Sequence, residues 1–258
     1  MRLASLAALA LLAAILPLRP AAAQVADLPL ATGGTERVLL LVPPNPRAVL
    51  IMLPGGDGTI AIDNSGQVQR GGNFLIRTRD LWVQQGLAVL LVAPPDGHSL
   101  MGERHSPAYA AAIGTAADFA RSRVNAPVWL VGTSQGAIAA VNGAARLGTK
   151  IAGLVVSSSV TRLGRSGETV FDAYPGSVAV PALVVANTRD TCVVSPPGDA
   201  AALAAALSAS PRKEVVTFES SEIRSDPCEA MSPHGYLGIE AAVIRGIADW
   251  IKSSPARG

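Results

Sequence analysis

Cysteine and histidine are scarce in this chain of 258 residues, and no run of basic residues interrupts it. Its two cysteines, Cys192 and Cys228, have no nearby His or Cys cluster that would complete a tetrahedral metal site. Without a lysine-rich tail or basic run, the chain lacks the electrostatic footprint of a nucleic-acid-binding protein. Nothing resembles a phosphate or dinucleotide loop. We therefore expect no metal, no cofactor and no nucleic-acid partner.

The N-terminal residues have the pattern of an export signal. Arg2 precedes an almost unbroken apolar stretch over residues 3–16, and three alanines stand before Gln24. The stretch is shorter than the ~20 residues of a membrane-spanning helix, and no charged stop-transfer cluster follows it. We predict a signal peptide over residues 1–23, no stable membrane anchor, and export to the periplasm or out of the cell. An uncleaved anchor is the alternative.

The remaining chain, residues 24–258, fits a single α/β domain. Removing residues 1–23 takes away Arg2 and Arg19 but no acidic residue, so 21 Lys+Arg become 19 against 19 Asp+Glu. No internal repeat, charge block or Ser/Gly linker divides the domain, and we expect a monomer. In an oxidising compartment Cys192 and Cys228 are expected to form a disulfide, with two free thiols as the alternative.

Short apolar runs alternate with Ala-rich helical stretches. The runs are nearly continuous rather than alternating, which is typical of strands buried on both faces. The alternation predicts a mostly parallel central sheet with helices on both faces. The first two strands, separated only by residues 43–47, are expected to form an antiparallel hairpin at one edge. We predict strands over 38–41, 48–53, 88–93, 128–131, 153–157, 182–186 and 214–218, and helices over 80–85, 107–123, 135–147, 199–208 and 237–252.

A serine between two glycines occupies one strand-to-helix junction. The segment Gly132-Thr133-Ser134-Gln135-Gly136 follows the apolar run 126–131 and precedes Ala- and Val-rich sequence. A serine hydroxyl is a poor nucleophile unless a sharp turn holds it exposed beside a base and fixed N–H dipoles. The G-x-S-x-G pattern is weak by itself, but this setting favours a nucleophile elbow over an ordinary Gly-rich turn.

Two further polar segments follow later in the chain. Asp190 comes just past the strand 182–186, and His234 stands before the final amphipathic helix. Ser, Asp, His is one of the chain orders in which a catalytic triad occurs. With these segments and their spacing the chain resembles the α/β-hydrolase superfamily over residues 38–252. The resemblance implies Ser134 as nucleophile, His234 as general base and acid, and Asp190 as the group that orients the imidazole.

Other residues compete for these roles. His98 and His105 lie in the loop after strand 88–93, where surface histidines are the favoured interpretation. Asp190 is the acid directly past a buried strand, and its rivals are Asp172, Asp199 and Asp226. A disulfide would favour Asp190 independently, because Cys192 is two residues after it and Cys228 is six before His234. One bridge would then tie the acid loop to the base loop.

An oxyanion hole needs two N–H groups aimed at the developing negative oxygen. The elbow supplies one from Gln135, and the Gly-rich segment 54–58 should supply the other through Gly56. Many members of the superfamily have His-Gly at this point, whereas this chain has Pro-Gly-Gly. The missing histidine leaves Gly55 and Asp57 open as alternative donors.

The expected substrate site is a shallow, open cleft. Only residues 160–180 separate the strand 153–157 from Pro181, too few for a separate cap domain. Phe171 and Tyr174 either form a short apolar wall or pack against the core. The candidate pocket residues are Asp57, His98, Phe171 and Tyr174.

Carboxylic-ester hydrolysis is the leading function hypothesis, with small or polymeric esters as substrates. The same triad would also serve a peptidase, an amidase or an acyltransferase, because the leaving group is read by pocket shape. A non-catalytic binding protein on a hydrolase fold is the third possibility. An intact Ser, Asp and His together with both glycine loops argues against it.

Overall fold

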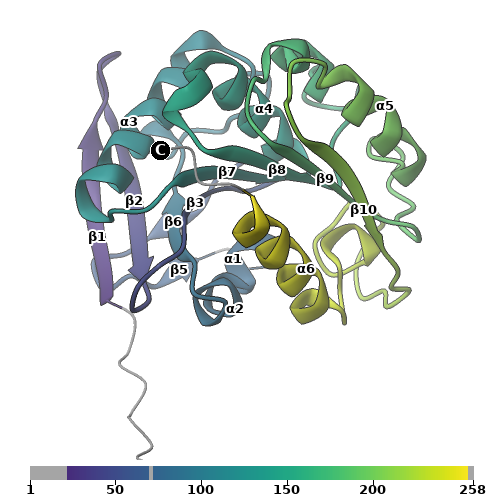
Figure 1. Ribbon diagram of the computed structural model, residues 1–258, viewed down its shortest axis with the longest axis horizontal. Helices are drawn as coiled ribbons and strands as arrows, with labels where there is room; N and C mark the ends of the chain where they lie inside the picture. The colour runs from purple at the N-terminus through teal and green to yellow at the C-terminus, as the bar shows by residue number, and fades with distance from the viewer. Residues whose placement is uncertain (1–21, 70–71, 255–258) are drawn as a thin grey trace, which may run out of the picture.

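An eight-stranded sheet organises the protein (Figure 1). The structure is a computed structural model that describes residues 22–69 and 72–254. Strand order is β1-β2-β6-β3-β7-β8-β9-β10, with β1 and β2 antiparallel to their neighbours and the rest parallel. The strands are β1 (Ala22–Pro29), β2 (Thr35–Val42), β3 (Val49–Leu53), β6 (Ala88–Val92), β7 (Val128–Thr133), β8 (Gly153–Ser157), β9 (Ala182–Asn187) and β10 (Lys213–Phe218), and β4 (Ala61–Ile62) and β5 (Val68–Gln69) form a separate ribbon.

Helices cover both faces of this sheet (Figure 1). One apolar cluster joins alternate strand residues, such as Ile51 and Leu130, to α3, α4 and α5. A second joins the intervening residues, such as Leu50 and Val131, to α1, α2 and α6. The continuous apolar strands therefore supply two cores, one on each face. The helices are α1 (Phe74–Arg77), α2 (Arg79–Gln84), α3 (Pro107–Arg123), α4 (Gln135–Leu147), α5 (Ala200–Ala206) and α6 (Glu240–Ser253).

The predicted fold class is confirmed, including the absence of a large cap. Between β8 and β9 the chain forms only the short 3₁₀ turns η3 (Val170–Ala173) and η4 (Pro175–Ser177). Helices α3 and α4 have the predicted bounds. Pro107 opens α3 after the side chain of Ser106 caps it, and the elbow serine and Gly148 flank α4.

The predicted hairpin between the first two strands is wrong. Strand β6 lies between β2 and β3, and β3 runs parallel to both β6 and β7. Every residue of β3 is buried, so it needs neighbours on both sides. The hairpin partner of β2 is instead β1, which is largely exposed and suits an edge.

The predicted signal peptide lies almost entirely outside the described residues. Its last two residues, Ala22 and Ala23, pair with Val42 and Leu41 at the start of β1. Cleavage before Gln24 would shorten this edge strand by two residues without touching the parallel strands. Within residues 22–69 and 72–254, none of the helices has the length and hydropathy to cross a bilayer.

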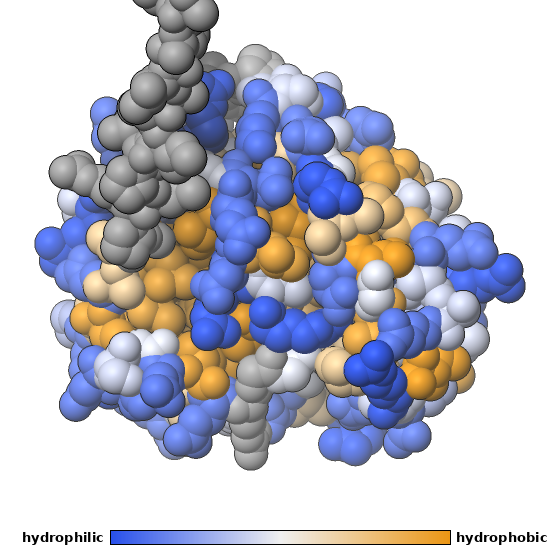
Figure 2. Space-filling model, turned by 90° about the horizontal axis from the view of Figure 1, so that it is seen from below, coloured by the Kyte–Doolittle hydropathy of each residue, from blue (hydrophilic) through white to orange (hydrophobic). Residues whose placement is uncertain are grey.

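Helix α6 shows how the lower face is built. Val243, Ile244 and Ile247 are buried against the sheet, while Arg245 and Asp249 point outward. Seen from below, the surface is accordingly a mixture in which hydrophilic residues divide the hydrophobic areas (Figure 2). Apolar areas interrupted in this way are usual for the surface of a folded domain.

Glu36 is a buried acidic side chain. It lies on β2 opposite Leu28 of β1, is fully buried, and neither carboxyl oxygen has a hydrogen-bond partner in the part of the chain that the structure describes. Burial raises the pKa of the Glu36 carboxyl to about 8. Burial, and to a lesser degree the charge of Glu36, also raises the pKa of Tyr109 in α3. The uncharged form of Glu36 is therefore the one that the fold accommodates.

Glu36→Gln is expected to stabilise the protein increasingly as pH rises. An unfolded chain ionises Glu36 near 4.5 and the folded chain near 8, so between these values the folded state binds more protons and wild-type stability falls with rising pH. The variant does not titrate there, and its advantage in Tm should grow by about 10 °C between pH 5 and pH 8. Thermal unfolding across this range measures it. The control is the exposed Glu103→Gln, and parallel Tm profiles for wild type and Glu36→Gln would refute the assignment.

Candidate active site

The elbow holds Ser134 in a backbone conformation that side chains rarely adopt. Ser134 follows β7 and precedes α4, with φ +55° and ψ −125°. Its N–H donates to Ser157 O at 2.9 Å, and its carbonyl accepts from Ala137 N at 3.0 Å. Non-glycine residues with positive φ cost on the order of 1–3 kcal/mol and persist only where the surroundings impose them. The result is a serine that is partly exposed at the end of a fully buried strand.

The flanking glycines make this turn possible. A Cβ on Gly136 would lie 1.9 Å from Leu53 O, at the end of the neighbouring strand β3. A Cβ on Gly132 would lie 2.3 Å from Gly136 O. Both positions bring backbone against backbone, so neither tolerates a side chain. The glycines of the motif therefore have a steric role.

His234 lies in the 3₁₀ turn η6 (Pro233–Gly235) and is only 4% exposed. Its Nδ1 is 2.8 Å from Asp190 Oδ2. Its Nε2 is buried and has no hydrogen-bond partner. With the Nδ1–H donating to the carboxylate, Nε2 carries the lone pair that can accept a proton.

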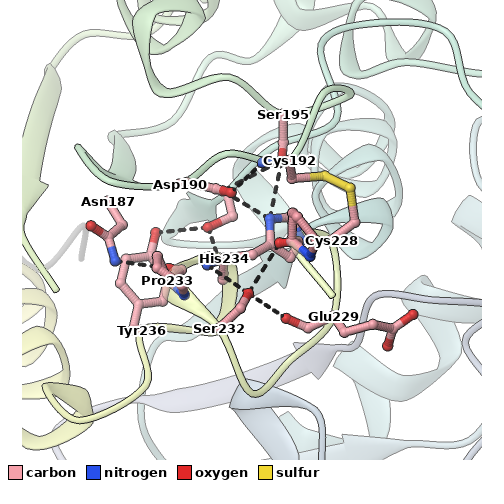
Figure 3. A network of polar contacts seen from close by, with 12 residues as sticks. Asn187, Asp190, Cys192, Ser195, Cys228, Glu229, Ser232, Pro233, His234 and Tyr236 are labelled. Atoms are coloured by element: carbon pink, nitrogen blue, oxygen red, sulfur yellow. Dashed lines mark hydrogen bonds and ion pairs between the residues drawn. A yellow bond between two sulfur atoms is a disulfide. The ribbon is translucent and has the colours of Figure 1, made fainter. Parts of the chain in front are cut away.

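Asp190 is held just past β9 and is 6% exposed (Figure 3). Its Oδ1 accepts from Cys192 N at 2.9 Å, and its N–H donates to Asn187 O at 3.0 Å. The buried Asn187 side chain reaches the base loop, where its Nδ2 donates to Pro233 O at 2.8 Å. The acid and base loops are therefore joined by an amide as well as by the Asp–His contact.

Ser195 is a polar neighbour of this pair that sequence patterns did not single out. It is buried, and its Oγ lies 3.1 Å from His234 Nδ1 and 3.5 Å from Asp190 Oδ2 (Figure 3). Behind Asp190 lies a cavity of about 10 Å³, lined in part by Ser159 and Ser195. Ser159 Oγ is buried without a partner, and a space of this size holds about one water.

The expected disulfide is present between Cys192 and Cys228, with Cα atoms 4.6 Å apart. Cys192 is buried beside Asp190, whereas Cys228 is exposed and lines the same cleft as His234. The bridge spans 36 residues of sequence and links the segment after the acid to the segment before the base.

The Gly-rich segment after β3 lies against the elbow. A Cβ on Gly55 would be 2.8 Å from Ser134 Cβ and 3.4 Å from Ser134 Oγ. Gly58 N donates to Gly55 O at 3.2 Å, which closes a turn in which Gly56 has φ +65°. Gly55 thus lies beside the serine hydroxyl, and Gly56 and Asp57 line the same cleft.

Ser134 and His234 line one open cleft of about 750 Å³. Its floor and walls also include Gln135 and residues of the Gly-rich segment, among them Gly56 and Asp57. Further lining residues that the sequence did not indicate come from loops scattered along the chain. They include Asn73, Phe74, Met101, Arg165, Val193 and Glu229.

The structure does not bring the other pocket candidates into this cleft. Phe171 and Tyr174 lie on η3 and at its end, are 40% and 58% exposed, and pack toward α4, where Arg146 lies 5.3 Å from the Tyr174 ring. His98 is exposed after the 3₁₀ turn that follows β6.

The rival histidine and acids also have partners elsewhere. His105 Nδ1 lies 2.8 Å from the buried Glu168. Asp172 caps η3, accepting from Thr169 N at 2.7 Å. Asp199 pairs with Arg162, and hydrogen bonding to that guanidinium lowers the pKa of the Asp199 carboxyl. Within the described part of the chain, no group of three or more His, Cys, Asp or Glu side chains could hold a metal ion.

The mostly parallel sheet, the helices on both of its faces and the polar residues beyond the strand ends are those of an α/β-hydrolase fold. Solved structures support this assignment. A dienelactone hydrolase from Anabaena variabilis superposes with TM-score 0.65 at 15% identity, covering 92% of this chain and 100% of that one. A lidless α/β serine hydrolase from Xanthomonas campestris gives 0.59 at 15%, covering 94% and 100%. An esterase from Pyrococcus furiosus gives 0.67 at 11%, covering 92% of each. No family model and no curated protein matches the chain.

Reduction of the disulfide is expected to destabilise the protein by about 4 kcal/mol on the chain-entropy model and to lower Tm by about 10 °C. Because the bridge joins the acid and base loops, amide hydrogen exchange should rise first in residues 188–195 and 226–235. Hydrogen-exchange mass spectrometry measures this on protein whose reduction has been verified by counting free thiols. Helix α3 serves as the internal reference. Equal increases in α3 and in these loops would contradict a local role.

Proposed function

We propose that the protein is an exported serine hydrolase that cleaves carboxylic esters through Ser134, His234 and Asp190. The observation that supports it most directly is the state of His234. Its Nδ1 is hydrogen-bonded to a buried carboxylate, its Nε2 has no hydrogen-bond partner among residues 22–69 and 72–254, and His234 lines the same cleft as Ser134. This is the arrangement in which an imidazole accepts a hydroxyl proton.

Acylation would follow from these positions. Ser134 Oγ attacks the ester carbonyl carbon while His234 Nε2 takes its proton, and Asp190 stabilises the resulting imidazolium. The carbonyl oxygen becomes an oxyanion that accepts hydrogen bonds from the N–H groups of Gln135 and Gly56. The intermediate then collapses: the C–O bond to the alcohol breaks, and His234 returns the proton to the leaving oxygen.

Deacylation repeats these steps with water. His234 Nε2 takes a proton from a water molecule, whose oxygen attacks the acyl carbon. Collapse of the second intermediate releases the carboxylic acid and returns the proton to Ser134 Oγ. No bound cofactor is needed for either half-reaction, because the atoms and charges balance between substrate, water and the three side chains.

The open cleft supports ester substrates of varied size, small or polymeric. The segment between β8 and β9 forms no cap over the site, and the cleft has apolar walls that include Phe74, Met101 and Val193. Esterases and a lidless serine hydrolase are among the structural neighbours, at 10–16% identity. These neighbours support ester hydrolysis as the class of reaction, and the substrate is not inferred from them.

Export is supported by two independent features. The N-terminal sequence has the composition of a signal peptide. The Cys192–Cys228 disulfide is of a kind that persists in oxidising compartments.

Ser134→Ala and His234→Ala are each expected to lower kcat by about 10⁴-fold or more while the protein stays folded. A fluorophosphonate probe should label wild type at pH 8 and leave Ser134→Ala unlabelled. The exposed Ser122→Ala on α3 is the matched control and should behave as wild type. Absence of labelling in the folded wild type would favour a binding protein over an enzyme.

Hydrolysis of p-nitrophenyl esters of graded chain length, beside the matched anilides, should distinguish the chemical classes. We expect turnover of acetate and butyrate esters at rates at least about 100-fold above the anilides, because p-nitrophenolate is stable enough to leave before it is protonated, whereas the anilide nitrogen has to receive a proton as it leaves. Film clearing with an aliphatic polyester extends the series to polymers. Cleavage of anilides alone would assign the site to a peptidase or amidase instead.

A further inference from the structure

A buried arginine lies directly behind the Gly-rich loop. Arg104, between β6 and α3, is fully buried, and within the described residues its guanidinium forms no ion pair. Its Nη2 donates to Gly56 O at 2.9 Å, and its Nη1 donates to Leu100 O at 3.4 Å. Burial lowers the pKa of the guanidinium, and the nearby charges of Tyr109, Glu168 and Asp57 oppose this shift. Taking a cation out of water is costly, and the shorter of its two hydrogen bonds goes to Gly56 O, which points to that carbonyl as the group it holds.

The loop needs an external anchor because glycine does not fix its own conformation. Gly56 has φ +65°, and a side chain there would meet nothing within 4 Å. Glycine adopts φ of either sign at similar cost, so the peptide planes on its two sides could rotate. One plane is held by Gly58 N–H, which donates to Gly55 O. Arg104 holds the other through Gly56 O.

Holding both carbonyls fixes the N–H direction. In a trans peptide the C=O and N–H point in opposite directions, and the described chain contains no cis peptide bond. The Gly55 carbonyl shares its plane with the Gly56 N–H, and the Gly56 carbonyl shares its plane with the Asp57 N–H. With both carbonyls held, Arg104 fixes the plane of the Asp57 N–H directly and limits the rotation at Gly56 that would turn the Gly56 N–H.

Arg104 is itself fixed by the helix that begins at the elbow. The buried Asn142 of α4 donates through Nδ2 to Arg104 O at 3.0 Å and to Ser106 O at 2.8 Å. Gly58 leaves room for the guanidinium, because a Cβ there would lie 3.0 Å from Arg104 Nη2. One helix therefore positions both the nucleophile at its start and, through Asn142, the arginine behind the loop.

We propose that Arg104 is a positioning residue for the oxyanion hole, acting through the Gly56 carbonyl on the direction of the loop N–H. The proposal rests on the proposed esterase function. Arg104 does not contact substrate. It determines how well the transition-state oxygen is bound, and so it affects kcat more than KM.

The test compares an ester with its thionoester, whose sulfur is a poor acceptor for an oxyanion hole. For Arg104→Met we expect kcat on the oxygen ester to fall about 10- to 100-fold with KM within about threefold, since losing one oxyanion donor costs about 10²–10³. The ratio of oxygen-ester to thionoester kcat should fall by about tenfold. Arg104→Lys keeps a donor and should recover part of both. The exposed Arg123→Met is the matched control.

An unchanged ratio in the folded variants would overturn the role of Arg104, even if both rates fall together. If circular dichroism shows that Arg104→Met does not fold, the ratio of oxygen-ester to thionoester kcat measured for Arg104→Lys decides instead. Failure of both to fold would assign Arg104 to the fold and likewise overturn the proposal. A wild type that resists fluorophosphonate and cleaves no ester would instead defeat the proposed function, so the two failures are distinguishable.

Discussion

The close approach of the elbow to the end of β3 is the constraint on which the site depends. Gly136 lies so near Leu53 O that no side chain fits between them, and this contact helps hold Ser134 at positive φ. The next residues after Leu53 form the Gly-rich loop, so the same contact sets the loop beside the serine. The strain at one residue is therefore balanced by packing between two parallel strands and α4. Ser134 and the Gly-rich loop form one backbone unit.

Asp190 and His234 are held by different means. They lie in the loop after β9 and in η6 before α6. The Cys192–Cys228 bridge, the Asn187–Pro233 hydrogen bond and the Asp190–His234 contact connect the two loops. Side-chain and covalent links depend on solvent and redox state, whereas the glycine contacts at the elbow do not. Changes of environment should therefore affect the base before they affect the nucleophile.

Much of the fold was predictable because its signals are local. The bounds of α3 and α4 follow from Pro107 and from the glycine motif, and the apolar runs identify the parallel strands. The pairing of β2 with β6 rather than β3 was not predictable, because these strands are far apart in the sequence and no local pattern encodes such a pairing. The contact between Asp190 and His234 agrees with the expectation that functional residues gather beyond the carboxyl ends of the strands. Ser195 and Arg104 were missed because a lone serine or arginine gives no pattern until the fold gives it neighbours.

Two buried atoms of cleft residues, which lack hydrogen-bond partners within the described residues, indicate which chemical groups the cleft binds. His234 Nε2 and Gln135 Oε1 are buried, lack partners, and belong to residues that line the cleft. With His234 Nδ1 donating to Asp190, both are acceptors. An unsatisfied buried acceptor costs about 1–3 kcal/mol, and a donor that reaches it recovers this free energy. A hydroxyl proton at Nε2 is such a donor, whether it comes from Ser134 or from water. A hydroxyl group that donates there is stabilised in the position from which the imidazole can accept its proton.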